Sequence, residues 1–261
     1  MSIATVGCNF HCDFCQNSDI SQGKVPTRHV PPKTLAELAS RDGSIGVAYT
    51  YTEPFIWFEY IRDTGRIVHE KGLANVLVTN GYVNEEPLRE LLPVIDAMNV
   101  DVKSMNPDFY TKVCGGKLED VLRTVEIANE SCLVEVTNLI IPGQNDSDDE
   151  IRKLCEWVKD NLGAGTPLHF SRFYPQYKLD HLPPTPVSRI ESARNIALDV
   201  GLQYVYCGNV TGHSGENTYC PGCKKIVVGR IGYTITEWNL DKDNKCKFCG
   251  TPINIIGSYK S

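Results

Sequence analysis

Residues 75–103 read N-V-L-V-T-N-G-Y-V-N-E-E-P-L-R-E-L-L-P-V-I-D-A-M-N-V-D-V-K. A β-branched run over residues 75–79 ends in Asn80-Gly81, a segment with helical periodicity covers residues 85–92, and a second apolar run covers residues 98–103. Apolar runs that alternate with helical segments are typical of β–α–β units in a parallel sheet. This stretch therefore predicts an α/β fold.

The same alternation extends in both directions along the chain. Further strands are expected at residues 2–6, 45–50, 133–141, 168–173 and 204–207. Further helices are expected at residues 54–71, around 118–128, around 151–162 after a candidate N-cap at Ser147, and at 188–200. These elements make about six βα units and a seventh strand, which is too few for an eight-fold barrel. We predict a partial (β/α)6, TIM-like barrel over residues 1–211, with a doubly wound open sheet as the alternative.

A cysteine-rich segment, C-N-F-H-C-D-F-C at residues 8–15, follows the first expected strand. A [4Fe–4S] cluster is normally held by four cysteines. Cys8, Cys12 and Cys15 would therefore hold three irons and leave the fourth open to a small molecule. A structural zinc knuckle is the alternative, but such sites usually consist of paired C-x2-C motifs, and no free pair partners this one. We predict a [4Fe–4S] cluster.

Two C-x2-C motifs near the C-terminus predict a second metal site. Cys220-Pro-Gly-Cys223 and Cys246-Lys-Phe-Cys249 are separated by 22 residues that read as strand, glycine turn and strand. Two such knuckles on hairpins form a tetrahedral four-thiolate site of the zinc-ribbon or rubredoxin type. We predict a metal-binding ribbon over residues 212–261 that holds zinc, with a single iron or an auxiliary iron–sulfur cluster as alternatives.

Composition and charge restrict the partners and the compartment. The formal net charge is −6, although residues 218–261 contain seven Lys/Arg and three Asp/Glu, which gives +4 there and −10 for the rest. This balance argues against nucleic acid or an anionic membrane as the partner of the whole protein. No apolar run reaches the ~18 residues of a membrane helix. Eleven cysteines without an export signal indicate a soluble protein of the reducing cytoplasm. The first strand begins at residue 2, which is consistent with a truncated N-terminus.

Polar residues occupy the C-terminal ends of the expected strands, where barrel active sites lie. Buried parallel strands should be almost continuously apolar, so these positions are candidates for binding cofactor or substrate. Each of these positions also has a simpler explanation. Glu53 could cap a strand–helix junction, and Asn80-Gly81 could form only a turn. Asp101 and Lys103 could form a surface salt bridge, and His169 could be a core residue whose hydrogen bonds are made within the protein. The candidate residues are Thr52, Glu53, Thr79, Asn80, Asp101, Lys103, Thr137, Asn138, His169 and Arg172.

Motifs along nearly the whole chain resemble one family. They are C-N-F-x-C-x-F-C-Q-N, Y-T-Y-x-E-P, T-N-G-Y, D-V-K, I-I-P-G-x-N-D, H-F-S-R-F-x-P, Y-V-Y-x-G-N, C-P-x-C and C-x-F-C-G. Together they resemble the radical S-adenosylmethionine (SAM) superfamily, and within it the radical SAM component of the AmmeMemoRadiSam system, a branch similar to pyruvate formate-lyase activating enzymes. Members of this branch commonly carry a further N-terminal segment with additional cysteines.

The resemblance implies a cofactor and a set of contacts. In the superfamily the open iron chelates the amino and carboxylate groups of SAM, and the reduced cluster breaks the C5′–S bond to release a 5′-deoxyadenosyl radical. The implied contacts are Phe14 at the adenine, Thr52 and Glu53 at the amino group, Thr79 and Asn80 at the methionyl moiety, and Asp101 and Lys103 at the carboxylate end. Tyr51 and Thr52 stand where the family motif has glycines. Thr137, Asn138, His169 and Arg172 are expected to line the barrel interior.

These observations predict a radical SAM enzyme that abstracts hydrogen from a substrate. By family analogy that substrate is a glycine in a partner protein, and the electron donor is a flavodoxin or ferredoxin. Two alternatives are a non-catalytic iron–sulfur electron-transfer scaffold and a zinc-ribbon adaptor. Failure to bind SAM would favour the scaffold, and salt-dependent nucleic-acid binding by the ribbon would favour the adaptor.

Overall fold

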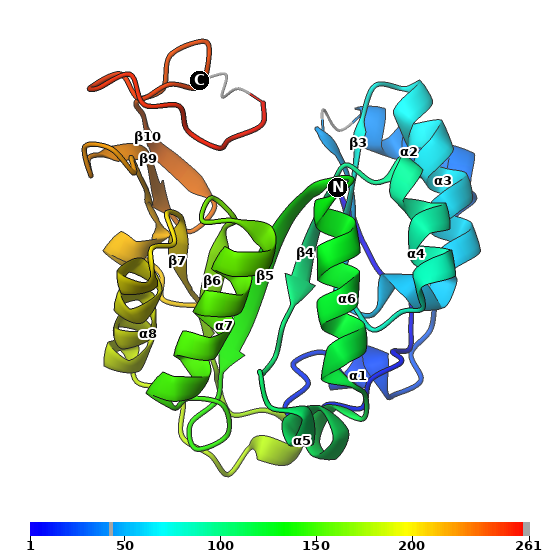
Figure 1. Ribbon diagram of the computed structural model, residues 1–261. Coiled ribbons are helices and arrows are strands. Elements are labelled where there is room, and N and C mark those ends of the chain that lie inside the picture. Colours follow the sequence, from blue (N-terminus) through cyan, green and yellow to red (C-terminus); the bar gives the residue numbers. More distant parts are fainter. Residues whose placement is uncertain (42–43, 258–261) are drawn as a thin grey trace. The chain divides into compact units, whose positions relative to one another are not determined.

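The computed structural model describes residues 1–41 and 44–257 (Figure 1). Its strands and helices alternate as expected, and most boundaries lie within two residues of the predicted ones. The strands of the main sheet are β1 (Ser2–Ile3), β2 (Gly46–Tyr49), β3 (Ala74–Thr79), β4 (Ala97–Asp101), β5 (Leu133–Ile140), β6 (Leu168–Arg172) and β7 (Val205–Gly208). The helices are α1 (Ser18–Ser21), α2 (Pro32–Arg41), α3 (Phe58–Glu70), α4 (Glu85–Leu91), α5 (Pro107–Phe109), α6 (Leu118–Asn129), α7 (Asp148–Leu162) and α8 (Val187–Val200).

The order of the strands identifies the type of fold. Within the described residues, seven strands form one sheet in which the spatial order is the chain order, β1 to β7. The strands from β1 to β5 pair in parallel, and so do β6 and β7. A doubly wound sheet reverses its strand order at a switch point, and no reversal occurs here. The predicted partial barrel is therefore confirmed, and the open-sheet alternative is wrong.

The chain divides into two compact units, and the boundary falls inside β5. The first unit comprises Met1–Thr137 with Pro175–Pro183, and the second comprises Asn138–Tyr174 with the chain from Pro184 onward. In the first unit the helices α2, α3, α4 and α6 pack side by side in that order along the sheet (Figure 1). In the second unit α7 and α8 are neighbours, and α8 lies against β6 and β7.

The strands bury one face completely and leave the other partly accessible. Val134, Val136 and Ile140 of β5 are buried, whereas Glu135 and Thr137, which alternate with them, are only partly buried. β3 and β4 show the same alternation. Because successive side chains of a strand point to opposite faces, Asn99 and Asp101 of β4 and Glu135 and Thr137 of β5 lie on the partly accessible face, whereas Thr79 of β3 and Asn138 of β5 lie on the buried face.

The C-terminal segment of the second unit is a small antiparallel sheet of β8 (Thr218–Tyr219), β9 (Ile226–Ile231) and β10 (Thr234–Trp238). Gly232, with φ of +56°, lies in the turn between β9 and β10, as the predicted hairpin requires. A buried apolar cluster joins this sheet to Tyr204, the residue before β7, and it includes Val227, Leu240 and Ile253. None of the described helices has the length and hydrophobicity needed to cross a membrane.

Candidate functional site

The cysteine-rich segment lies against residues 110–114, which form one turn of π-helix, η3 (Tyr110–Cys114). The backbone N–H of His11 donates to the carbonyl of Cys114 at 2.8 Å, and that of Asp13 donates to the carbonyl of Val113 at 3.0 Å. At the other end of the segment, the thiol of Cys15 contacts the hydroxyl of Ser21 at 3.1 Å. The backbone carrying the three cysteines is therefore fixed by the surrounding chain.

Cys8, Cys12 and Cys15 bring three thiol groups into one short segment. Soft thiolate donors are the ligand type that iron–sulfur clusters require, so the residues of this segment fit the predicted cluster.

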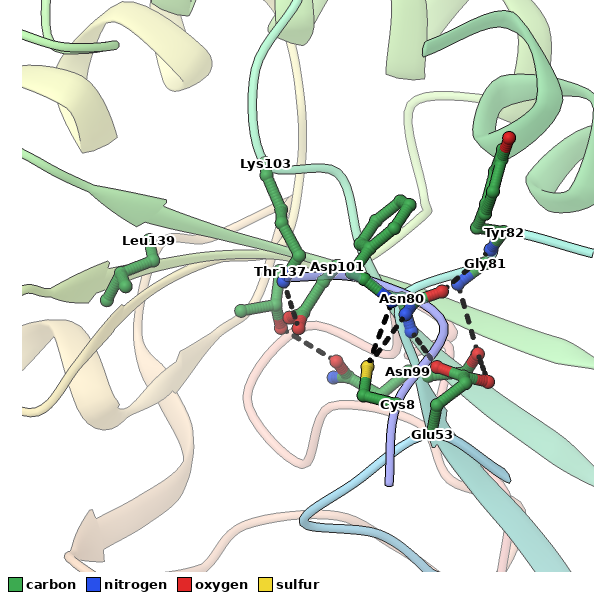
Figure 2. Close-up of polar contacts among 12 residues, drawn as sticks. Cys8, Glu53, Asn80, Gly81, Tyr82, Asn99, Asp101, Lys103, Thr137 and Leu139 are labelled. Atoms are coloured by element: carbon green, nitrogen blue, oxygen red, sulfur yellow. Dashed lines mark hydrogen bonds and ion pairs between the residues drawn. The ribbon is translucent and has the colours of Figure 1, made fainter. Parts of the chain in front are cut away.

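Asn80, at the end of β3, links the strand ends to the first of these cysteines (Figure 2). Its side-chain amide donates to Asn9 Oδ1 at 2.8 Å and contacts Cys8 Sγ at 3.5 Å. Its Oδ1 accepts from the backbone N–H of Tyr82 at 2.8 Å, and the Asn9 amide donates to the carbonyl of Tyr82 at 2.6 Å. The Asn80-Gly81 turn is thus more than a chain reversal, because it holds the cysteine-bearing segment.

Glu53 is 1% exposed and connects the ends of β2 and β3. Oε1 accepts from the Thr79 hydroxyl at 2.7 Å and from the Phe55 N–H at 3.1 Å, and Oε2 accepts from the Asn80 N–H at 2.9 Å. Burial raises the pKa of this carboxyl to about 7, despite these hydrogen bonds, which lower it. The bond to Phe55 caps the short 3-10 helix η1 (Pro54–Trp57), so the capping interpretation of Glu53 is confirmed.

One of the two residues that replace the family's glycines keeps a glycine-like backbone. Tyr51 has a φ of +68°, in the left-handed region that glycine adopts without strain. Its carbonyl accepts from the Asn17 side chain at 2.8 Å, and the neighbouring Thr52 hydroxyl donates to the carbonyl of Thr5 at 2.9 Å. These two bonds tie this turn to the segments on both sides of the cysteines.

Asp101 and Lys103 form an ion pair of 2.9 Å at the end of β4 (Figure 2). The Lys103 side chain is only 12% exposed, so this is not a simple surface salt bridge. Burial lowers the pKa of Lys103, but Asp101 and the thiols of Cys12 and Cys114 outweigh it and hold that pKa well above its usual range. The Lys103 ammonium also lies 5.6 Å from the ring centre of Phe14, which is itself buried.

Thr137 lies on the same face of the sheet as this ion pair. Its hydroxyl donates to Asn99 Oδ1 at 2.8 Å, and Figure 2 shows both residues next to Asp101. Asn138 is 3% exposed and belongs to the opposite, fully buried face of β5. The first unit therefore brings together candidate residues from β2, β3, β4 and β5 beside the cysteine segment.

The remaining candidates belong to the second unit. His169 of β6 stacks on Tyr206 of β7, with ring centres 4.9 Å apart. Arg172 donates to the carbonyl of Thr185 at 2.7 Å and lies over the ring of Tyr174 at 4.8 Å. The contacts of these two residues with SAM or substrate stay predictions.

The four ribbon cysteines converge on one point. Cys220 and Cys249 have their sulfurs 3.5 Å apart, those of Cys223 and Cys246 are 3.7 Å apart, and all four lie within 4.8 Å of one another. A tetrahedron with metal–sulfur bonds of about 2.3 Å has sulfur–sulfur edges of about 3.8 Å. The ribbon is therefore built as a four-thiolate metal site, as the paired C-x2-C motifs predicted.

Three residues of the cluster region were not predicted as parts of the site. Asn9 contacts Asn80, the hydroxyl of Tyr110 accepts from the backbone N–H of Lys103 at 2.9 Å, and the carbonyl of Cys114 accepts from the N–H of His11 at 2.8 Å. Asn9 lies inside the cysteine motif and could have been found from the sequence. The other two belong to η3, about a hundred residues away in the chain, and only the tertiary structure reveals their position.

Two relatives of known sequence cover most of the chain. The uncharacterized protein MJ0808 of Methanocaldococcus jannaschii is 48% identical over 261 residues, which cover 98% of this chain and 78% of the relative. The pyruvate formate-lyase 1-activating enzyme of Escherichia coli K12 is 26% identical over 220 residues, which cover 77% of this chain and 89% of the enzyme.

A solved structure shares the fold. The crystal structure of Streptococcus suis SuiB bound to S-adenosylmethionine superposes with a TM-score of 0.64 at 12% identity, over 80% of this chain and 50% of SuiB. A family model for the radical SAM superfamily matches residues 2–158, the region that contains the three cysteines and the strand ends around Glu53, Asn80 and Lys103. The chain therefore belongs to the radical SAM superfamily.

Proposed function

We propose that this protein is a radical SAM enzyme in which Cys8, Cys12 and Cys15 hold a [4Fe–4S] cluster. When bound, the reduced cluster supplies one electron that cleaves SAM into methionine and a 5′-deoxyadenosyl radical, and this radical takes a hydrogen atom from the substrate to become 5′-deoxyadenosine. The observation that carries the proposal is the Asn80 contact, which ties the three-cysteine segment to the polar ends of the parallel strands.

The chain's own residues would orient SAM at this site. The Lys103 ammonium, held by Asp101 and largely shielded from water, provides a fixed positive charge for the carboxylate of SAM. The Glu53 carboxylate would accept from the amino group of SAM, and the bonds from Thr79 and Asn80 fix its position. Phe14, whose ring centre lies 5.6 Å from the Lys103 ammonium, provides an apolar wall for the adenine.

We further propose a glycine residue of a partner protein as the hydrogen donor, and a low-potential flavodoxin or ferredoxin as the electron donor. The support is the similarity to activating enzymes, whose names give a protein as their target. All eleven cysteines are free thiols, which supports a reducing cytoplasmic setting. For the ribbon we propose zinc, which prefers a closed tetrahedral four-thiolate site and stabilises the fold there.

The first experiment is anaerobic reconstitution with iron and sulfide, followed by dithionite and SAM and an assay for 5′-deoxyadenosine. We expect product from the wild type, none from Cys12→Ala, and product from Cys155→Ala, which removes a buried thiol of α7. A wild type that holds a reducible cluster and forms no product would contradict the proposal.

The hydrogen donor can be tested separately. Desalted protein from host cells grown on α-deuterated glycine is added to the reaction, and 5′-deoxyadenosine is analysed by mass spectrometry. Deuterium in the product identifies a glycine residue as the donor. Product formation stimulated by the added protein but free of deuterium would exclude it.

A further inference from the structure

A cavity of about 630 Å³, here called the edge cavity, lies in the first unit beside β1. Four consecutive residues, 3–6, line it, and its apolar wall includes Leu35, Trp57 and Tyr60. The rings of Trp57 and Tyr60 are stacked, with their centres 5.4 Å apart. The volume falls in the range of ligand pockets, about 300–1,000 Å³. None of the lining residues is a proposed ligand of the cluster or of SAM.

Along this cavity the backbone of β1 has an open edge. Within the described residues, β1 is the last strand on its side of the sheet and pairs only with β2. The carbonyls of Met1, Ile3 and Thr5 all accept hydrogen bonds from β2 and the residues that follow it, at 2.8–2.9 Å. In a parallel sheet the backbone groups of successive residues point to opposite edges, so those of the exposed Ala4 point away from β2. An edge of this kind is a template for a further strand.

A second segment that borders the edge cavity is positively charged. Residues 20–36 contain Lys24, Arg28 and Lys33 and neither Asp nor Glu, in a chain whose formal net charge is −6. Arg28 lines the cavity and is exposed. The Tyr60 hydroxyl donates to the carbonyl of Val30 at 2.8 Å and so ties this segment to α3. An exposed guanidinium beside the cavity favours a carboxylate as its partner.

We propose that the edge cavity binds an extended, acidic segment of a partner protein, which adds a strand to the open edge of β1. In strand addition, main-chain hydrogen bonds provide affinity, and side-chain pockets provide specificity. Apolar side chains of the added segment pack against Leu35 and Trp57, and acidic side chains pair with Arg28. The inference goes beyond the proposed function, because it requires neither the cluster nor SAM.

The test is fluorescence anisotropy with a labelled eight-residue peptide, acetyl-Glu-Glu-Val-Thr-Val-Thr-Glu-Glu-amide, added to the purified full chain. The valines supply apolar side chains, and the glutamates supply negative charge at both ends. We expect saturable binding, and binding about tenfold weaker when lysines replace the glutamates. No binding of the glutamate peptide up to about 1 mM, or equal binding of both peptides, would overturn the inference.

Two further peptides test whether the bound segment is an added strand. One carries N-methyl groups on both valines and the other on both threonines, so each lacks the N–H groups of one edge. An added strand pairs with β1 through one edge only. One of the two peptides should therefore bind about tenfold more weakly and the other as the parent does. Equal affinities of the two methylated peptides would exclude strand addition.

Three variants locate the site. Arg28→Glu should weaken binding of the glutamate peptide about tenfold. Lys33→Glu makes the same charge change at an exposed residue that does not line the cavity, and it should leave the affinity unchanged. Ala4→Pro removes an N–H group from the open edge and should also weaken binding about tenfold. If circular dichroism shows that Ala4→Pro does not fold, Arg28→Glu still decides, because unchanged binding by that variant would overturn the inference.

A second copy of the chain is the competing occupant of this edge. Sedimentation of the peptide-free protein should give the same mass for wild type and Ala4→Pro. A wild-type dimer that dissociates in a folded Ala4→Pro variant would assign the edge to self-association and overturn the inference.

Discussion

Replacing Glu53 by Gln should change how the stability of the metal-free protein depends on pH. Burial raises the pKa of the Glu53 carboxyl from 4.5 to about 7, even though hydrogen bonds from Asn80, Thr79 and Phe55 lower it. The folded protein therefore binds this proton more tightly than the unfolded chain does. The stabilisation from proton binding is complete below pH 4.5 and is lost as the pH rises through 7.

The size of the effect follows from the difference between the two pKa values. Each tenfold difference in proton affinity corresponds to about 1.4 kcal/mol, so the free energy of unfolding attributable to Glu53 should fall by about 3 kcal/mol. Glutamine cannot titrate and does not show this loss.

The assay is urea unfolding of metal-free wild type and Glu53→Gln at intervals between about pH 4 and pH 9. The free energy of unfolding of the variant minus that of the wild type should rise by about 3 kcal/mol over this range, with most of the rise between pH 4.5 and 7. A difference that stays constant would refute the reasoning, because it would mean that folding does not change the proton affinity of Glu53.

Three further changes have defined outcomes. Asn80→Ala removes the amide that contacts Cys8. It should lower the free energy of unfolding by about 1–2 kcal/mol and lower the iron bound per chain. Full iron loading of this variant would contradict the role of Asn80 in holding the cysteine segment. Gly116→Ala places a Cβ atom against the Phe10 ring. The free energy of unfolding, measured with urea, should fall by about 1–3 kcal/mol. An unchanged unfolding midpoint would show that the Phe10 ring moves aside freely. Cys246→Ala should remove one metal equivalent by elemental analysis and lower the melting temperature, and undiminished metal content would place the metal elsewhere.

The sequence predicted the features that depend on local pattern. Alternating apolar runs located the strands β2 to β7, and Ser147 was identified as the N-cap of α7, where its hydroxyl accepts from the N–H of Glu150. The alternation in β5 placed Thr137 and Asn138 on opposite faces, as the burial of that strand confirms. These predictions succeed because strand periodicity and capping act over a few residues.

Features that depend on distant contacts or on a weak apolar pattern were missed. The helix α2 was not predicted, and it buries only Leu35, Ala36 and Ala39. The first strand was expected over residues 2–6 but comprises only Ser2–Ile3. The backbone hydrogen bond between His11 and Cys114 joins segments about a hundred residues apart, and no local pattern in the sequence indicates it.

The central claim is that three thiolates leave one iron open for SAM. Its most direct test is electron–nuclear double resonance on the reconstituted, reduced protein with SAM labelled by 15N in the amino group and 17O in the carboxylate. The account predicts hyperfine coupling from both labels, and none in Cys12→Ala. A loaded and reduced wild-type cluster without coupling from either label would contradict it.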